Sequence, residues 1–176
     1  MLDVIVAKEN LELLAGPVAR ALGALLNAAD VGVTEIDPTL SDTAAFCEQY
    51  QVGMHQAANC VVLEAKRGDE TWYAACVILG STRADVNGLA RRTLDARKVS
   101  FAPMELATTL TGMEYGAVTP VGLPAEWPIL VDKAVADSEL VIVGSGIRKS
   151  KLVVSGQFLT SLPNVHVLEG LGRSVQ

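Results

Sequence analysis

The first part of the chain carries two helical patterns separated by a strand pattern. Over residues 10–29, leucines and valines recur at the three- and four-residue spacing of one helix face. Because Pro17 suits the first turn of a helix but would break an interior turn, this pattern predicts a helix near 17–28 after a shorter turn. Residues 31–36 have a strand pattern, and a Ser-Asp pair of good N-caps opens a short helix over 41–50.

The middle of the chain predicts a β-hairpin followed by a helix and a short strand. Residues 59–66 and 71–79 are rich in β-formers, and residues 67–70 between them form a four-residue hairpin connection. Residues 85–96 then form a helix that begins with an aspartate cap, and residues 98–101 form a strand. This order of elements places a long two-stranded unit at the centre of the sequence.

The last part of the chain contains a long loop between a helix and several short strands. Pro103 opens the helix and Gly112 ends it. Residues 113–128 hold three prolines and two glycines without periodicity, and a loop of this length is usually functional or mobile. The strands that follow are expected at 129–131, 140–143, 152–154 and 165–168, with a helical piece near 156–162. The pattern predicts one α/β domain of the α+β type over residues 1–176, with a largely antiparallel or mixed sheet.

Composition and charge restrict the partners. Hydrophobic residues make up 50% of the chain and aromatic residues 5%, so the core consists mostly of Ala, Val and Leu. The formal net charge of -6 argues against DNA or a wide RNA backbone as partner, but it permits a local contact with one nucleotide or the end of an RNA. Three cysteines without a CxxC pair indicate free thiols, and neither a signal-peptide core nor a membrane-length apolar stretch occurs. We therefore expect a cytoplasmic protein that does not contact a membrane.

Familiar catalytic patterns are missing. The glycine-containing segment 144–150 resembles a phosphate-binding loop, but it lacks the glycine spacing of the dinucleotide and triphosphate motifs, so a tight turn explains it better. His55, Cys60 and Cys47 do not have the spacing of a zinc site or of an established Cys/His pair. The sequence therefore predicts neither a metal nor a cofactor.

Three segments in the second half of the chain form a recognisable set. They are Met-Glu-Tyr-Gly-Ala-Val-Thr-Pro-Val-Gly-Leu-Pro over 113–124, Ile-Leu-Val-Asp over 129–132 and Val-Ile-Val-Gly-Ser-Gly over 141–146. Together with the hairpin, they resemble the YbaK/EbsC family of aminoacyl-tRNA deacylases, which is related to the editing domain of bacterial prolyl-tRNA synthetases. The resemblance is clearest over 31–168. It implies a mixed, partly barrel-like sheet surrounded by helices, and hydrolysis of the ester that joins a wrong amino acid to the 3′ end of a tRNA.

The same resemblance implies a set of site residues. The family's glycine-x-x-x-proline loop corresponds to Gly116, Ala117, Val118, Thr119 and Pro120. Because the following proline holds Thr119 extended, we expect its hydroxyl or carbonyl to be directed toward the pocket. The strand ending in aspartate and the small-residue turn add four substrate-binding candidates: Asp132, Gly144, Ser145 and Gly146. From the residues alone, Asp132 is better suited to cap the following helix than to act as a general base.

One position departs from the family pattern. Where active members commonly carry a lysine at the start of the first hairpin strand, this chain has Asn59, which donates a hydrogen bond but carries no charge. Two functions stay open on this evidence. One is a free-standing editing hydrolase in which Asn59 and Gly116 act on the ester, with water as nucleophile; the other is a catalytically impaired binding module for an aminoacyl-nucleotide, a small ligand or a protein. Four basic residues are expected on the surface, where they would form a small rim for an RNA end if they cluster: Arg83, Arg148, Lys149 and Lys151. The sequence does not determine the oligomeric state.

Overall fold

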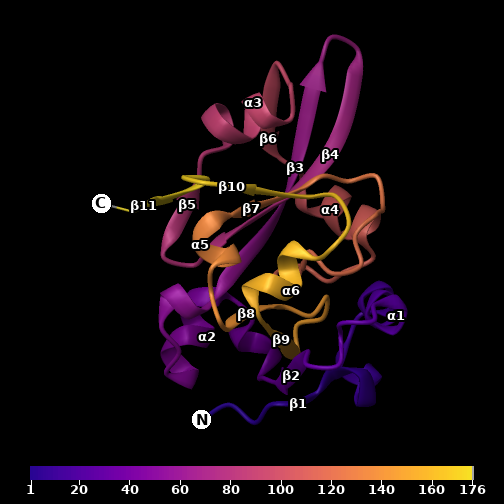
Figure 1. Cartoon of the computed structure of the whole chain (residues 1–176), viewed down its shortest axis with the longest axis vertical. Coiled ribbons are helices and arrows are strands. Elements are labelled where there is room, and N and C mark those ends of the chain that lie inside the picture. Colours follow the sequence, from indigo (N-terminus) through magenta and orange to yellow (C-terminus); the bar gives the residue numbers. More distant parts are fainter. Residues whose placement is uncertain (176) are drawn as a thin grey trace.

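The computed structural model describes residues 1–175, which form two main sheets, one small sheet and short surrounding helices (Figure 1). The strands are β1 (Ile5–Val6), β2 (Gly32–Glu35), β3 (Ala58–Arg67), β4 (Glu70–Leu79), β5 (Thr82–Ala84), β6 (Lys98–Phe101), β7 (Ile129–Asp132), β8 (Val141–Gly144), β9 (Ser150–Val154), β10 (Val165–Leu168) and β11 (Gly172–Ser174). The helices are α1 (Gly16–Ala24), α2 (Thr43–Tyr50), α3 (Arg91–Thr93), α4 (Met104–Thr111), α5 (Lys133–Ala136) and α6 (Gly156–Thr160).

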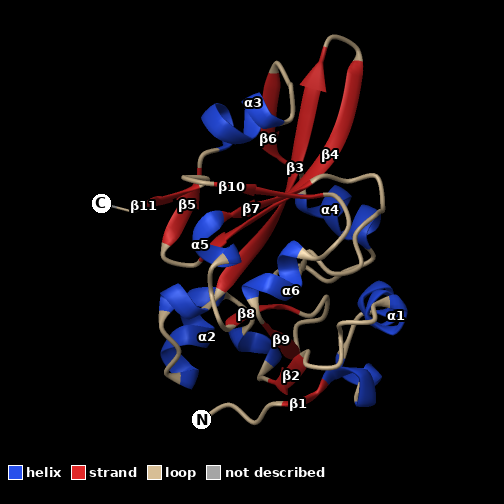
Figure 2. Cartoon of the chain, viewed as in Figure 1, coloured by secondary structure: helices blue, strands red, loops and turns tan. Residues whose placement is uncertain are grey.

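The larger sheet is mixed and the smaller main sheet is antiparallel. The five strands of the larger sheet run in the order β10-β7-β4-β3-β6, with β10 and β4 both parallel to β7 and the other pairs antiparallel. The four-stranded sheet has the order β1-β2-β9-β8, and a parallel bridge from Ala57 to Ile142 joins it to the start of β3. The mixed α/β class is therefore confirmed, although the sheets do not close into a barrel (Figure 2).

Most predicted elements occur, with shifts at turns and helix ends. The predicted helix at 17–28 is the shorter α1, because the chain becomes extended at Leu25. The hairpin connection has two residues rather than four: Arg67 pairs with Glu70, and Gly68 adopts a φ of 58°, the left-handed region that such a tight turn favours. The third difference is the predicted helix at 85–96, which is a π-helical turn, Val86–Ala90, followed by α3.

Several cap predictions are confirmed, and three short strands were not predicted. The Asp42 carboxylate accepts hydrogen bonds from the backbone N–H groups of Ala44 and Ala45 at the start of α2. At the end of α4, Gly112 takes a φ of 68°. Strands β1, β5 and β11 were missed because each has only two or three residues and depends on a partner distant in sequence.

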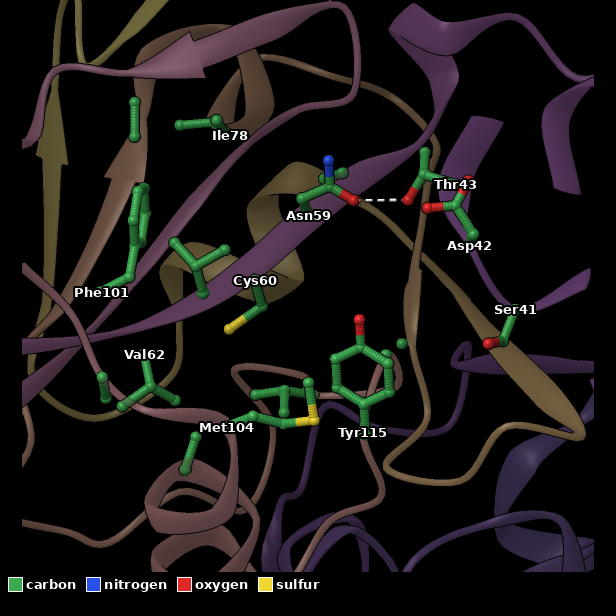
Figure 3. A pocket seen from close by; sticks show the side chains of 18 of the residues that line it. Ser41, Asp42, Thr43, Asn59, Cys60, Val62, Ile78, Phe101, Met104 and Tyr115 are labelled. Atoms are coloured by element: carbon green, nitrogen blue, oxygen red, sulfur yellow. Dashed lines mark hydrogen bonds between the residues drawn. The ribbon is translucent and has the colours of Figure 1, made fainter. Parts of the chain in front are cut away.

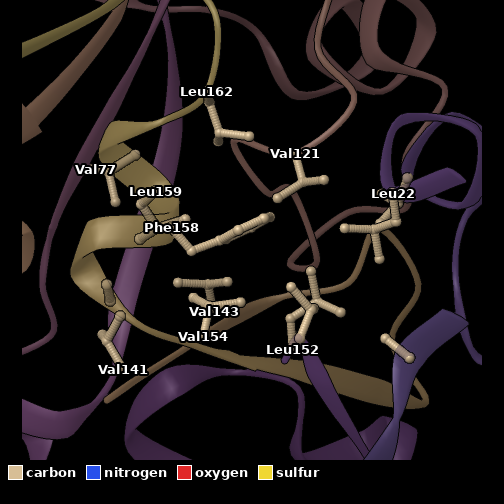
Figure 4. Close-up of a cluster of buried hydrophobic side chains, with 14 of the residues drawn as sticks. Leu22, Val77, Val121, Val141, Val143, Leu152, Val154, Phe158, Leu159 and Leu162 are labelled. Atoms are coloured by element: carbon tan, nitrogen blue, oxygen red, sulfur yellow. The ribbon is translucent and has the colours of Figure 1, made fainter. Parts of the chain in front are cut away.

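The largest hydrophobic cluster lies between the two main sheets and α6, with α1 on its other side (Figure 4). Phe158 and Leu159 of α6 pack there with Val143 and Leu152 of the antiparallel sheet. Truncating a buried Phe such as Phe158 to Ala costs about 3–5 kcal/mol of folding free energy. This core fixes the start of β3 relative to the end of β8 and the start of β9, and the candidate site lies at that junction.

Candidate functional site

A cavity of about 610 Å³ opens beside the start of the β3–β4 hairpin. One wall is apolar and comes from the hairpin, β6 and α4, including Val62, Ile78, Phe101 and Met104. The opposite wall is polar and is built by the segment that leads into α2 (Figure 3). Asn59 lies between the two walls, so the cavity offers a polar group beside a space suited to a nonpolar substituent.

The Asn59 side chain is held by a neighbouring helix. The Thr43 hydroxyl at the start of α2 donates a hydrogen bond to the Asn59 side-chain oxygen (Figure 3). The Asn59 amide nitrogen has no hydrogen-bond partner among residues 1–175, although Asn side chains in strands often bond to the nearby backbone. The Thr43 contact therefore orients the amide so that its two N–H donors stay available to a ligand.

The loop after α4 brings backbone donors to the same cavity. Gly116 and Val118 line the cavity, and Gly116 has a φ of 76°, which favours glycine. The Ala117 N–H is occupied by the Glu114 carbonyl at 3.1 Å, whereas the N–H groups of Gly116 and Val118 make no hydrogen bond within the described chain. Two backbone donors are thus unused on residues that line the same cavity as Asn59.

The β8–β9 turn holds this loop in position. The Gly146 N–H donates to the Ala117 carbonyl at 2.8 Å. Gly144 approaches the loop so closely that a Cβ there would lie 2.5 Å from the Ala117 carbonyl oxygen. The Arg148 guanidinium donates to the carbonyls of Tyr115 and Pro38, each at 3.1 Å, so Arg148 braces the loop rather than forming part of a free basic rim.

Lys151 is the main correction to the predicted surface residues. Its side chain lines the cavity and the residue is only 7% exposed. Its Nζ donates to the Ser41 carbonyl oxygen at 2.9 Å and lies 5.1 Å from the centre of the Phe46 ring. Burial lowers the pKa of the Lys151 ammonium. Nothing in the local pattern indicates this burial, because Lys151 follows the exposed Lys149 by two residues in a polar run.

Four of the ten predicted site residues line the cavity: Asn59, Gly116, Val118 and Gly144. The other six do not, and their contacts explain why: Ala117, Thr119, Pro120, Asp132, Ser145 and Gly146. Asp132 does not cap α5 with its side chain; its carboxylate accepts a hydrogen bond from the Gly172 N–H at 3.1 Å and so secures β11. Ser145 donates to backbone carbonyls in its own turn, while the Thr119 hydroxyl is buried and makes no hydrogen bond in the described chain. These six residues lie outside the cavity lining, and the hydrogen bond between Gly146 and Ala117 supports the loop that does line it.

Neither thiol chemistry nor a metal centre is apparent in the part of the chain described. Cys60 lines the cavity, but burial raises its thiol pKa well above the ordinary value, which disfavours the nucleophilic thiolate. Burial also raises the pKa of Cys76 to about 12. Residues 1–175 contain no group of three or more His, Cys, Asp or Glu side chains placed to hold a metal ion. No helix over the same residues is long and apolar enough to cross a membrane.

Comparisons with known proteins identify the family and the fold. A family model described as "Aminoacyl-tRNA editing domain" matches residues 37–162. A crystal structure described as a "putative trans-editing enzyme for prolyl tRNA synthetase" is 21% identical, with a TM-score of 0.74 over 92% of this chain and 99% of that one. A scaffold protein from a study of epitope backbone grafting is 20% identical, with a TM-score of 0.76 over 91% of this chain and 97% of that one.

A third structure has the same fold. It is described as hypothetical protein APE2540 and is 21% identical, with a TM-score of 0.73 over 88% of this chain and 95% of that one. The comparison with curated proteins gave no match. At these identities the three structures establish a shared fold, while the family model carries the assignment of family.

Proposed function

The chain belongs to the aminoacyl-tRNA editing domain family, and from this premise we propose that it hydrolyses the ester of a mischarged tRNA. Water is the proposed nucleophile, and no metal ion takes part. The observation that carries the proposal is that the unused N–H donors of Asn59 and of the loop at Gly116 line one cavity. Three donor groups on residues that line one cavity are suited to an ester carbonyl, whose oxygen gains negative charge during attack by water.

The reaction requires little chemical help from the side chains. An aminoacyl ester is already activated, so the site has to orient it, admit a water and stabilise the oxyanion. In our proposal, the Asn59 amide and the N–H groups of Gly116 and Val118 bind the carbonyl oxygen. Because Thr43 holds the Asn59 oxygen, the amide presents its donors without reorganising when the substrate arrives.

The two ends of the cavity suit different parts of the substrate. Asp42 is the acidic residue among those that line the cavity, and its Oδ1 caps α2 while Oδ2 makes no hydrogen bond within residues 1–175. We assign this carboxylate to the positively charged α-amino group of the substrate. The apolar wall takes the amino-acid side chain, and Phe101, which is 60% exposed at the cavity, offers a stacking surface to the terminal adenosine.

A local footprint of this kind agrees with the acidic charge of the chain. Recognition of one aminoacyl group and one nucleotide needs a pocket rather than a wide basic face. The partner we propose is therefore the 3′ end of an aminoacyl-tRNA, in contact with the cavity and its rim.

The test is a deacylation assay on a panel of mischarged tRNAs, with the wild-type protein, Asn59→Ala and Gly116→Ala. We expect the wild type to release at least one amino acid well above the buffer rate. Asn59→Ala should lower that rate by about 100- to 1000-fold, the loss expected for one neutral oxyanion donor. Asn27→Ala is the matched control, because Asn27 is an exposed residue that bonds to Ser161 and does not line the cavity.

Two results would contradict the proposal. Ester loss no faster than in buffer across the whole panel would exclude hydrolysis of these substrates. Saturable binding of aminoacyl-tRNA without turnover would instead favour the binding module, the alternative that the neutral Asn59 raises. Full activity in Asn59→Ala would keep the hydrolase but remove Asn59 from its site.

A further inference from the structure

The proposed mechanism leaves the buried cation of the cavity wall, Lys151, unused. Lys151 lies on β9, opposite Gly144 in the β8–β9 ladder, and is only 7% exposed. The other cationic side chain in the cavity wall is Arg83, which is exposed. Lysines are rarely buried unless they are paired, so the position of Lys151 calls for a reason.

The ammonium group of Lys151 is only partly hydrogen-bonded within the described residues. An ammonium group has three N–H donors, and one of them bonds to the Ser41 carbonyl at 2.9 Å. The Phe46 ring provides a cation–π contact at 5.1 Å. Within residues 1–175, no carboxylate lies within ion-pair distance of Lys151, and the remaining N–H groups have no hydrogen-bond acceptor. An oxygen that gains negative charge inside the cavity would supply the missing partner.

The neighbours of Lys151 also contact the loop that contains Gly116 and Val118. Ser41, which accepts its hydrogen bond, has a hydroxyl oxygen 3.4 Å from where a Cβ on Gly116 would stand. Gly144, its partner across the ladder, packs directly on the carbonyls of Ala117 and Val118. Lys151 therefore lines the same cavity as Gly116 and Val118 and shares the neighbours Ser41 and Gly144 with their loop.

We propose that Lys151 is a catalytic residue whose ammonium binds the ester carbonyl oxygen as that oxygen becomes an oxyanion. It supplies from β9 the positive charge that Asn59 cannot supply from β3. In the reaction, a water oxygen bonds to the carbonyl carbon and the carbonyl electron pair moves to the oxygen beside Lys151. The C–O bond to the ribose then breaks, and the proton lost by the water passes to the ribose oxygen, so amino acid and tRNA leave while Lys151 keeps its own proton.

The surroundings of Lys151 favour a strong response to a negative charge. Burial lowers the pKa of its ammonium, and Arg148 acts in the same direction. Cys47 and Asp42, which face it from α2 and its cap, raise that pKa. In a dry site, a charge-assisted hydrogen bond is about twice as strong as a neutral one, so an oxyanion gains more from Lys151 than a neutral carbonyl does.

The proposal rests on the proposed function, and the test separates the two by measuring binding without turnover. Calorimetry compares two ligands: adenosine 3′-(1-aminoethyl)phosphonate, whose tetrahedral anionic group resembles the oxyanion, and 3′-deoxy-3′-alanylamidoadenosine, whose amide is planar and neutral. We expect the wild type to bind the phosphonate at least 10-fold more tightly, and Lys151→Met to lose about 100-fold in phosphonate affinity, the scale of an oxyanion donor. Affinity for the amide should change less than threefold.

Lys98→Met is the matched control, because it makes the same substitution at an exposed lysine of β6 that does not line the cavity, and it should change neither affinity by more than threefold. Equal losses for both ligands in Lys151→Met, or no loss, would overturn the proposal. If Lys151→Met does not fold, the wild type decides: phosphonate binding no tighter than amide binding would refute it. A wild type that hydrolyses no ester but prefers the phosphonate in a Lys151-dependent manner would refute the proposed function and support Lys151 as the anion-binding group.

Discussion

Replacing Gly144 with Ala tests the connection between the β8–β9 turn and the loop that we assign to the ester carbonyl. Gly144 stands at the end of β8, and its φ is not in the left-handed region. The glycine is required here by space rather than by backbone conformation. A Cβ at this position would lie 2.5 Å from the carbonyl oxygen of Ala117 and 2.7 Å from that of Val118.

The size of the effect follows from those contacts. Both contacts are with backbone atoms, so rotation of a side chain cannot relieve them, and the loop has to move by about 1 Å to restore ordinary van der Waals separation. Overpacking of this kind costs about 1–3 kcal/mol of folding free energy. A displacement of about 1 Å in groups that position a substrate lowers the rate by about 100-fold.

Urea unfolding and single-turnover deacylation measure the two effects on the same protein. The control is Gly23→Ala, because Gly23 lies in α1 with no atom within 4 Å of its added Cβ. Gly23→Ala should raise the free energy of unfolding by about 0.5–1 kcal/mol and leave the rate unchanged. Normal stability and rate in Gly144→Ala would refute the packing argument, while lost stability with a normal rate would remove the loop from the catalytic site.

Three further perturbations address single contacts. Thr43→Val removes the hydroxyl that orients Asn59. Because a hydrogen bond of this kind has a net worth of about 1 kcal/mol, the deacylation rate should fall about 5-fold. An unchanged rate would show that the contact does not position the amide. Phe101→Ala should raise KM about 10-fold with little change in kcat if the terminal adenosine stacks there, whereas Leu110→Ala, exposed on α4 outside the cavity, should leave both constants unchanged. Because burial lowers the pKa of folded Lys151 below its value of 10.5 in the unfolded chain, the unfolded state binds more protons than the folded state at pH values between these two pKa values. The free energy of unfolding of the wild type should therefore rise with pH in that range relative to Lys151→Met. Urea unfolding of both proteins from pH 7 to 10 measures this, and a constant difference between their free energies of unfolding would contradict it.

Local signals predicted most of the helices and strands. The caps at Asp42 and Gly112 were readable because capping involves residues within one turn of each other. Strands β5 and β11 could not be predicted from the sequence, because residues 82–84 pair with residues 172–174, which are distant along the chain. The helical pattern that continued past Ala24 was equally misleading, since periodicity does not reveal where the chain turns into an extended segment.

In the candidate site too, the sequence predicted which segments take part but not where their side chains lie. Asn59, Gly116 and Gly144 came from motifs in the sequence, and they line one cavity in the structure. Thr119 and Asp132 came from the same motifs, but their side chains are buried away from it. A motif indicates which segments approach a ligand, whereas the direction of each side chain depends on how the neighbouring segment packs.

The amino-acid sequence by itself determined the mixed α/β class, the order of most elements, the irregular loop at 113–128 and the resemblance to editing domains. The tertiary structure alone decided that Lys151 is buried against Ser41 and Phe46 and that Thr43 holds Asn59. The physical reason is that the pattern along the chain encodes local conformation, whereas burial and charge environment arise where strands distant in sequence meet. A lysine in a polar run is expected in water until packing places another element over it, as α2 and its leading segment do here.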